Sequence, residues 1–255
     1  MEITEHDGVR TVTFDRPDAL NAFTTENAAD LADTLAASDP VELDAIVLTG
    51  EGRAFSAGGD LESIAAFEEM PAEAYERIDD TFGRLAEEAL DCRVPIVARV
   101  NGDAIGAGMA IVALSDFAYA ADVARFSAAF VRVGLIPDTG GTFLLPRLVG
   151  LRAAKELAFT GRFFGAEEAA ELELINGAVP EAELDERIEE LLDVLRERPT
   201  RTIGMAKRAI HANLGRGLEE ALDYENVIQS QAMGTDEHQE GVSAFLKERE
   251  PEFQS

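Results

Sequence analysis

Short apolar segments alternate with stretches of helical periodicity over the first two-thirds of the chain. Apolar runs bounded by turn signals predict strands, and we assign four of them, at 9–14, 45–49, 95–100 and 116–121. Apolar residues at helical spacing predict helices between these strands, at 25–37, 71–90 and 106–114. Strands that alternate with helices are typical of an α/β fold.

Beyond Pro180 the chain has only helical periodicity. The predicted helices span 181–197, 200–213, 218–233 and 236–248. Pro199 and the Gly215–Gly217 segment interrupt them, because proline and glycine do not favour a helix interior. We therefore predict a core over residues 1–198 and a C-terminal helical region over residues 199–255.

The charge of the chain is extreme. Asp and Glu total 50 against 22 Lys and Arg, which gives a formal net charge of −28. Such a field repels nucleic acid and anionic membranes, and concentrated salt would screen it. With only three lysines, at 155, 207 and 247, the composition favours a cytoplasmic protein of a halophile. An ordinary acidic enzyme is the alternative.

Several classes of protein are excluded at this stage. The 255 residues contain no apolar stretch of membrane-spanning length, and the acidic N-terminus does not resemble a signal peptide. Cys92 is the only cysteine, so an internal disulfide is impossible. The three histidines are scattered, and we expect neither a metal site nor a bound cofactor.

One turn carries a candidate catalytic carboxylate. Asp138 follows Pro137 and precedes Gly140 and Gly141, with an apolar run directly after. A carboxylate walled by apolar side chains can acquire a raised pKa and move protons. The alternative is that Asp138 caps the helix that begins near Gly140.

Two loops of small residues each follow a predicted strand. They are Ala54–Asp60 and Asn101–Gly108, and the second opens a helix. One backbone N–H group from each loop could hold an oxygen that becomes negative, which is an oxyanion hole. Close packing of helix on strand is the alternative reason for small residues. Neither loop has the dinucleotide or P-loop fingerprint.

The ordered motifs resemble those of the crotonase (enoyl-CoA hydratase/isomerase) superfamily. The matching segments are Arg16–Ala22, Ala54–Asp60, Asn101–Gly108, Gly134–Gly141, Thr160–Gly161, Ala166–Ala169 and Glu240–Phe245. The resemblance implies a spiral of ββα turns with a C-terminal helical trimerisation region, and a homotrimer or a dimer of trimers. It also implies acyl-CoA thioester substrates, with coenzyme A present only as part of the substrate.

The resemblance further implies a set of site residues. The backbone N–H groups of Ala57 and Ala107 would form the oxyanion hole. The positions implied for substrate and coenzyme A binding are Arg16, Ala19, Leu20, Arg53, Ala57, Gly58, Gly59, Asp60, Gly106 and Phe130. Arg16 and Arg53 would receive the phosphates, with Lys247 or Arg249 arriving from a neighbouring subunit. These arginines could instead pair with nearby acids.

The departures from the superfamily pattern concern the chemistry. Hydratases of this superfamily use two glutamates, and the matching positions here hold Ala110 and Phe130. Asp138 and its surrounding turn resemble the 1,2-epoxyphenylacetyl-CoA isomerase branch, in which the aspartate of this turn is the acid and base. Asp60 and Asp116 are interpreted as structural, and Asp103 as a less favoured second acid.

Three functions therefore stay open. The first is an enoyl-CoA isomerase in which Asp138 shuttles one proton. The second is an enoyl-CoA hydratase with an atypical base. The third is a non-catalytic crotonase-fold protein that binds or assembles partners.

Overall fold

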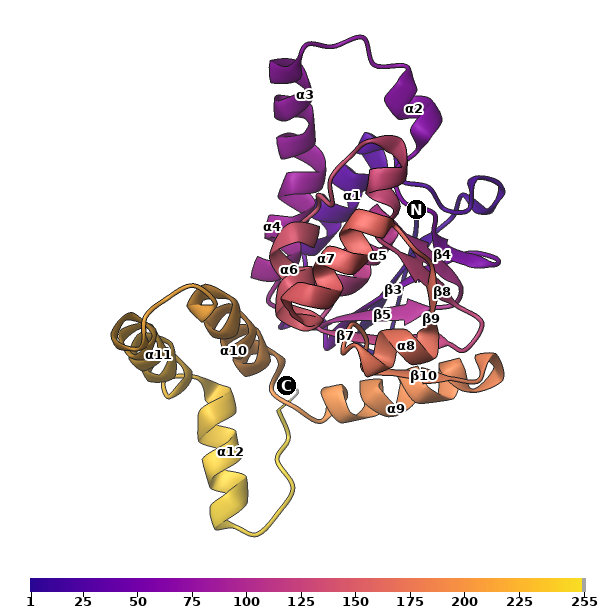
Figure 1. Ribbon diagram of the computed structural model, residues 1–255. Coiled ribbons are helices and arrows are strands. Elements are labelled where there is room, and N and C mark those ends of the chain that lie inside the picture. The colour runs from indigo at the N-terminus through magenta and orange to yellow at the C-terminus, as the bar shows by residue number, and fades with distance from the viewer. Residues whose placement is uncertain (254–255) are drawn as a thin grey trace.

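A computed structural model describes residues 1–253, and these form two β-sheets wrapped by helices (Figure 1). The larger sheet has the strand order β1-β2-β3-β5-β7-β10 and is parallel except for the β1–β2 hairpin. The smaller sheet has the order β4-β6-β8-β9, with only β9 antiparallel to its neighbour. The strands are β1 (Glu2–His6), β2 (Val9–Phe14), β3 (Ala45–Gly50), β4 (Ala54–Ser56), β5 (Ile96–Val100), β6 (Asp103–Ile105), β7 (Phe117–Ala121), β8 (Arg125–Ser127), β9 (Phe164–Gly165) and β10 (Gly177–Val179).

The chain repeats one unit along this spiral. Strands β3, β5 and β7 each add to the larger sheet, and each is followed at once by a strand of the smaller sheet, namely β4, β6 and β8. Helical segments then return the chain to the start of the next turn. This is the spiral of ββα turns that the sequence motifs imply.

The smaller sheet is the main feature that the sequence pattern does not predict. Its strands are two or three residues long, and two of them fall in segments 54–60 and 101–108, which the sequence indicates as loops. Segments of only two or three residues have no readable periodicity. Their pairing, for example Ala104 with Phe126, depends on contacts that the spiral brings together.

Strand β3 shows why the central strands of the larger sheet consist of continuous apolar runs. All six of its residues are buried. Ile46 and Leu48 face the main core, whereas Ala45 and Val47 face a second cluster under helix α9 (Leu184–Arg196). A parallel strand covered on both faces loses the polar alternation of a half-exposed strand.

The predicted helical segments are helical, with one irregularity, and three further helices, at 61–65, 150–160 and 166–171, lie where no helix was predicted. The predicted helix 71–90 consists of α3 (Pro71–Ile78), a π-helical turn (Asp79–Gly83) and α4 (Arg84–Asp91). The other helices of the core are α1 (Thr25–Ala36), α2 (Leu61–Ala65), α5 (Ala107–Leu114), α6 (Gly141–Leu148), α7 (Gly150–Thr160), α8 (Ala166–Glu171) and α9 (Leu184–Arg196). Short 3₁₀ segments lie at η1 (Pro17–Ala19), η3 (Ala129–Val133) and η4 (Glu181–Glu183).

Three helices extend away from the core at the C-terminal end: α10 (Thr200–Asn213), α11 (Leu218–Ala232) and α12 (Asp236–Leu246) (Figure 1). The predicted boundary between residues 198 and 199 falls between α9 and α10. The last two residues of the predicted region, 254 and 255, lie outside the described residues. The trimerisation role of this region stays a prediction.

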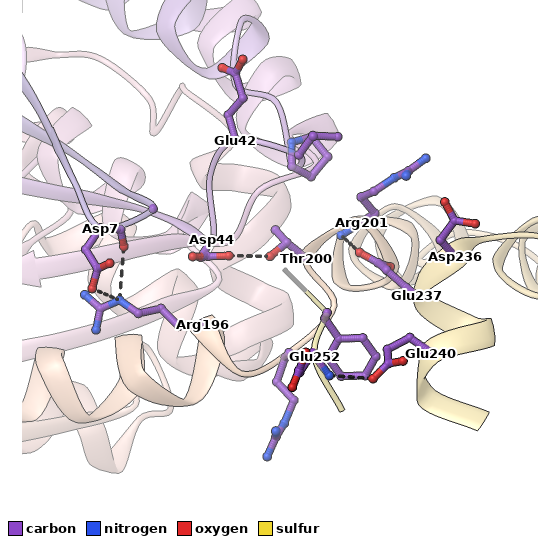
Figure 2. Close-up of a pocket in the computed structure, with 15 residues that line it drawn as sticks. Asp7, Glu42, Asp44, Arg196, Thr200, Arg201, Asp236, Glu237, Glu240 and Glu252 are labelled. Carbon is purple, nitrogen blue, oxygen red and sulfur yellow. Dashed lines mark hydrogen bonds and ion pairs between the residues drawn. The ribbon is translucent and has the colours of Figure 1, made fainter. Parts of the chain in front are cut away.

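Polar contacts join these helices to the core around a cavity of about 610 Å³ (Figure 2). Thr200 donates a hydrogen bond to Asp44 of the core, and within the C-terminal helices the Arg201 amide of α10 donates to Glu237 of α12. The tail folds back, with the Glu252 amide donating to Glu240 at 2.8 Å. None of the predicted site residues lines this cavity.

Candidate active site

The two small-residue loops meet, as an oxyanion hole requires. A Cβ atom on Gly58, whose φ is +92°, would lie 2.6 Å from the Ile105 carbonyl oxygen and 3.2 Å from the Ala107 nitrogen. A Cβ on Gly108 would lie 2.5 Å from the Ser56 carbonyl oxygen. Both glycines are therefore needed for close approach of the backbones.

The hydrogen bonds of the first loop correct one prediction. The Ala57 N–H donates to the Leu20 carbonyl at 2.9 Å, so it is already paired and is not a free oxyanion donor. The Gly58 N–H donates to Ser56 Oγ, and the Asp60 N–H donates to the Phe23 carbonyl.

The Gly59 amide differs from the Ala57 amide in this respect. Among residues 1–253, the Gly59 N–H is the amide of the 57–60 loop for which the structure gives no acceptor. A parallel bridge pairs Phe23 with Gly59, and in it the bonds run through the flanking residues Gly58 and Asp60. The Gly59 amide therefore points away from that partner. Sequence reasoning placed Gly59 only in the binding loop, because this bridge has no local signal.

Ala107 fulfils the geometry expected of the second donor. It is the first residue of α5, and the first N–H groups of a helix have no intrahelical acceptor. Gly106, at φ +55°, precedes it and donates to the Ser127 carbonyl at 2.8 Å. No side chain caps the helix. The Ala107 amide and the positive end of α5 are thus available to an anionic oxygen.

Phe130 lies beside this helix start. Its Cζ atom would be 3.9 Å from a Cβ on Gly106, and the side chain is 8% exposed. Ala110, one turn into α5, is buried as well. The two positions where hydratases of this fold would carry glutamates, by the motif resemblance, are therefore both apolar and buried.

Asp138 occupies a half-buried position on the turn before α6. Burial raises the pKa of its carboxyl group, and a hydrogen bond from the Thr139 hydroxyl to Asp138 Oδ1, at 2.9 Å, lowers it only in part. The side chain does not cap α6, since Gly140 is the N-cap and no side-chain bond is present. The capping interpretation of Asp138 is wrong.

Backbone contacts tie the Asp138 turn to the rest of the site. The Leu135 N–H donates to the Phe130 carbonyl at 3.0 Å, and the Gly141 N–H donates to the Asp138 carbonyl at 2.7 Å. The segment that carries the carboxylate is thus anchored to the residue beside the Ala107 amide.

Arg16 has a structural role, which was the alternative to phosphate binding. Its guanidinium pairs with Asp60 at 2.8 Å and donates to the Ala22 carbonyl at 2.6 Å. Asp60 caps α2 by accepting from the Ser63 N–H, which together with Arg16 lowers the pKa of its carboxyl group. Ala19 and Leu20 form the turn at η1, and the Leu20 carbonyl holds Ala57.

The other cations predicted to bind the phosphates, Arg53, Arg249 and Lys247, differ in whether they form an ion pair. Arg53 is exposed and has no ion pair within residues 1–253, so it stays the candidate of the core. Arg249 pairs with Glu240 of its own chain at 2.6 Å. Lys247 is exposed.

The other two acids considered from the sequence, Asp116 and Asp103, each form an ion pair. Asp116 pairs with Lys207 at 2.7 Å and accepts from the Ile96 N–H at 2.8 Å. Asp103 forms a two-bond ion pair with Arg125. Asp103 is therefore occupied and is not a second acid of the site.

Comparisons with known proteins agree with the fold and the motifs. A family model described as enoyl-CoA hydratase/isomerase matches residues 4–255. The chain is 38% identical to a probable enoyl-CoA hydratase of Rhodobacter capsulatus, over 99% of this chain and 96% of that one. It is 37% identical to the 1,2-epoxyphenylacetyl-CoA isomerase of Escherichia coli, over 96% and 95%.

A solved structure of an enoyl-CoA hydratase has the same fold. The enoyl-CoA hydratase of Mycobacterium smegmatis superposes with a TM-score of 0.91 at 33% identity, over 100% of this chain and 98% of that one. The chain belongs to the enoyl-CoA hydratase/isomerase family, and its fold is the crotonase fold. Relatives named as hydratase and as isomerase both occur, so the names do not choose between the two reactions.

Two further findings bear on the excluded classes. In the part of the chain that the structure describes, no helix is long and apolar enough to cross a membrane. Over the same residues, no group of three or more His, Cys, Asp or Glu side chains is arranged to hold a metal ion.

Proposed function

We propose that this protein is an enoyl-CoA isomerase that moves a double bond by a one-carboxylate proton shuttle. The observation that supports this proposal best is the pairing of one carboxyl group of raised pKa, Asp138, with apolar residues at the positions of both hydratase glutamates, Ala110 and Phe130. The family supplies the substrate class, which is an acyl-CoA thioester.

The proposed reaction needs one base and two amides. Asp138 removes a proton from the γ carbon of a 2-enoyl thioester, and the electron pair moves to the thioester oxygen as a dienolate. The Gly59 and Ala107 amides would hold that oxygen, and one such donor contributes about 2.7–4 kcal/mol. Asp138 then returns the same proton to the α carbon, which leaves the double bond between the β and γ carbons.

Hydration of the double bond would require a different set of catalytic groups. Water must be oriented and deprotonated while a proton reaches the α carbon, which calls for two groups that exchange protons. Phe130 and Ala110 cannot orient water, and both are buried. A single carboxylate serves a proton transfer between two carbons better than an addition at two points.

The experiment offers purified protein a 2-enoyl-CoA and the matching 3-enoyl-CoA in parallel. We expect interconversion of the two and no hydroxyacyl-CoA, and we expect D138N to abolish the interconversion. D103N is the matched control, because Asp103 is a carboxylate paired on the surface with Arg125, and it should keep full activity.

The three functions give three different results. Hydroxyacyl-CoA formed from the 2-enoyl-CoA would make the protein a hydratase and overturn the isomerase proposal. Binding of acyl-CoA without turnover, with wild type and D138N alike, would leave a binding protein. Equal interconversion by D138N would remove Asp138 from the mechanism.

A further inference from the structure

Thr139 adopts a backbone conformation that its side chain disfavours. Its φ is +52°, and among residues 1–253 it is the only β-branched residue with a positive φ. The two branches on Cβ crowd the backbone in this region, so a β-branched residue is rarely found there. Backbone strain of this kind points to a functional reason for keeping the residue.

The turn around Thr139 would accept other residues more readily. The Gly141 N–H donates to the Asp138 carbonyl at 2.7 Å, and the two residues between them, Thr139 and Gly140, have φ values of +52° and +75°. Two central residues of positive φ are the mark of a type I′ turn, which prefers Asn or Gly at the first of them. Local backbone preference therefore does not account for threonine at position 139.

The side chain of Thr139 is buried and makes one hydrogen bond. The residue is 4% exposed, and its Oγ1 donates to Asp138 Oδ1 at 2.9 Å. Within residues 1–253, this is the only hydrogen bond of the Thr139 hydroxyl. An ionised carboxylate can only accept, so the hydroxyl has to be the donor when Asp138 acts as a base.

Apolar side chains of two neighbouring helices lie against this turn. A Cβ on Gly140 would lie 3.5 Å from Leu114 Cδ2 of α5 and 3.6 Å from Ala86 Cβ of α4. No charged group of the described residues shifts the pKa of Asp138, which burial raises and which the Thr139 hydroxyl and the backbone of Asp138 itself lower. The Thr139 hydroxyl is therefore the one side-chain group that distinguishes the two oxygens of this carboxyl group.

We propose that Thr139 is a positioning residue, which holds Asp138 Oδ1 so that Oδ2 is the oxygen that takes and returns the proton. This inference rests on the proposed function, in which Asp138 is the base. A proton on Oδ1 would force the Thr139 hydroxyl to accept, and the hydrogen of that hydroxyl would then have no acceptor at a buried site, which costs free energy. A proton on Oδ2 leaves the hydrogen bond to Oδ1 in place.

The shuttle then uses one oxygen for both of its steps. The bond between Oδ2 and the proton forms as the bond from the γ carbon to its hydrogen breaks, and the electron pair moves to the thioester oxygen. That bond to Oδ2 breaks as the dienolate electrons join the proton to the α carbon. A carboxyl group held through Oδ1 rotates less between the two steps, and fixed orientation of this kind lowers the barrier to reaction.

Three substitutions separate the hydroxyl from the shape of the side chain. T139V keeps the branched Cβ and removes the donor, T139A removes the donor and one branch, and T139S keeps the donor. We expect T139V and T139A to lower kcat about tenfold or more, since a small displacement of a reacting group can cost about 10²-fold. Their KM should not change, because the interaction acts in the transition state. T139S should have the kcat of wild type.

The pH profile is a readout that a merely structural role of Thr139 would not move. The hydroxyl lowers the pKa of Asp138, so its loss in T139V should move the acid limb of kcat/KM to higher pH. T139S should keep the limb of wild type. T34V is the control, because Thr34 donates to the Asp30 carbonyl within α1, and its kcat and acid limb should equal those of wild type.

The melting temperature supplies a measurement that does not depend on activity. Below a pH of about 3.9, Asp138 is protonated in the folded and the unfolded chain, and T139V loses only a bond between neutral groups. At neutral pH the variant also leaves an ionised carboxylate without its donor, so its melting temperature should fall further below that of wild type. In the D138N background nothing titrates at position 138, and T139V should have the same effect at both pH values.

Two results would overturn the role of Thr139: a T139V enzyme with the kcat and acid limb of wild type, or a T139S enzyme as impaired as T139V. Far-UV circular dichroism establishes that each variant is folded. Equal interconversion by D138N would instead remove the proposed function. Loss of activity in D138N together with an unaffected T139V would overturn the positioning role alone.

Discussion

Lys207 of α10 lies 2.7 Å from Asp116 Oδ2, and its side chain is only 4% exposed. Asp116 also accepts from the Ile96 N–H, so the pair joins the C-terminal helices to strand β5. One of the three lysines of the chain is thus buried at the junction between the core and the C-terminal helices.

Replacement of Lys207 should destabilise the protein strongly. K207M leaves the Asp116 carboxylate without its counter-charge at a largely buried site, and breaking a buried pair in this way costs about 3–5 kcal/mol. Urea denaturation at constant salt measures the loss, with K247M as an exposed control. K207M/D116N should recover part of it, because the amide side chain is uncharged and its oxygen can still accept from the Ile96 N–H. A loss for K207M below about 1 kcal/mol would contradict a buried role.

Asp138 should make activity and stability respond to pH in opposite directions. Its pKa is raised by burial, so the ionised base is lost as the pH falls through a value above the ordinary one of about 3.9. The acid limb of kcat/KM should therefore lie above that value. A limb at or below it would mean that another group carries the proton.

The stability of the protein changes with the opposite sign. A raised folded-state pKa means that the folded protein binds the Asp138 proton more tightly, so this contribution is present below the unfolded pKa and is lost as the pH rises through the folded one. D138N removes the cost of a buried charge and should raise the melting temperature at neutral pH. The gain should vanish at a pH below about 3.9. A lower melting temperature for D138N at neutral pH would contradict this prediction.

The Gly59 amide can be removed on its own. G59P deletes the N–H group, and the loss of one oxyanion donor lowers kcat by about 10²–10³. G59A keeps the amide. Its new Cβ would lie 3.2 Å from Ile64 Cδ1, which needs to shift only slightly, so the kcat of G59A should stay close to that of wild type. Comparable kcat values for the two variants would place the donor elsewhere.

Salt should stabilise the fold. At a net charge of −28 the folded chain repels itself, and the Debye length falls from about 10 Å at 0.1 M to about 3 Å at 1 M. We expect the free energy of unfolding to rise over this range of KCl, as measured by urea titration. Sucrose at equal osmolality is the control, because it leaves the charge unscreened. A fall with added KCl would mean that surface ion pairs outweigh the repulsion.

The buried strands and the long helices were predictable because their signals are local. The run 45–49 reads as a strand by composition alone, and Thr200–Asn213 has the bounds that its periodicity predicts. The short strands β4 and β6 were missed because three residues are too few to show a pattern and their pairing joins segments about fifty residues apart.

The same distinction between local signals and long-range contacts applies to the candidate site. Asp138 stands out in sequence because proline and glycines surround it, but the sign of its pKa shift depends on burial, which the sequence does not determine. The choice between the Ala57 and Gly59 amides depends on which of them faces Leu20 and Phe23, residues far away along the chain. Side-chain identity carries no information about that choice.

The hydrogen bonds of the amides along the 57–60 loop set the kind of change that this loop tolerates. Ala57 and Asp60 anchor the loop, and Gly59 between them faces outward. Side-chain replacements that fit the space leave the order of bonded and unbonded amides unchanged. The insertion or deletion of one residue would instead turn the Gly59 amide towards the segment that contains Leu20 and Phe23. Divergence towards new substrates is therefore expected to proceed by exchange of side chains around a loop of fixed length.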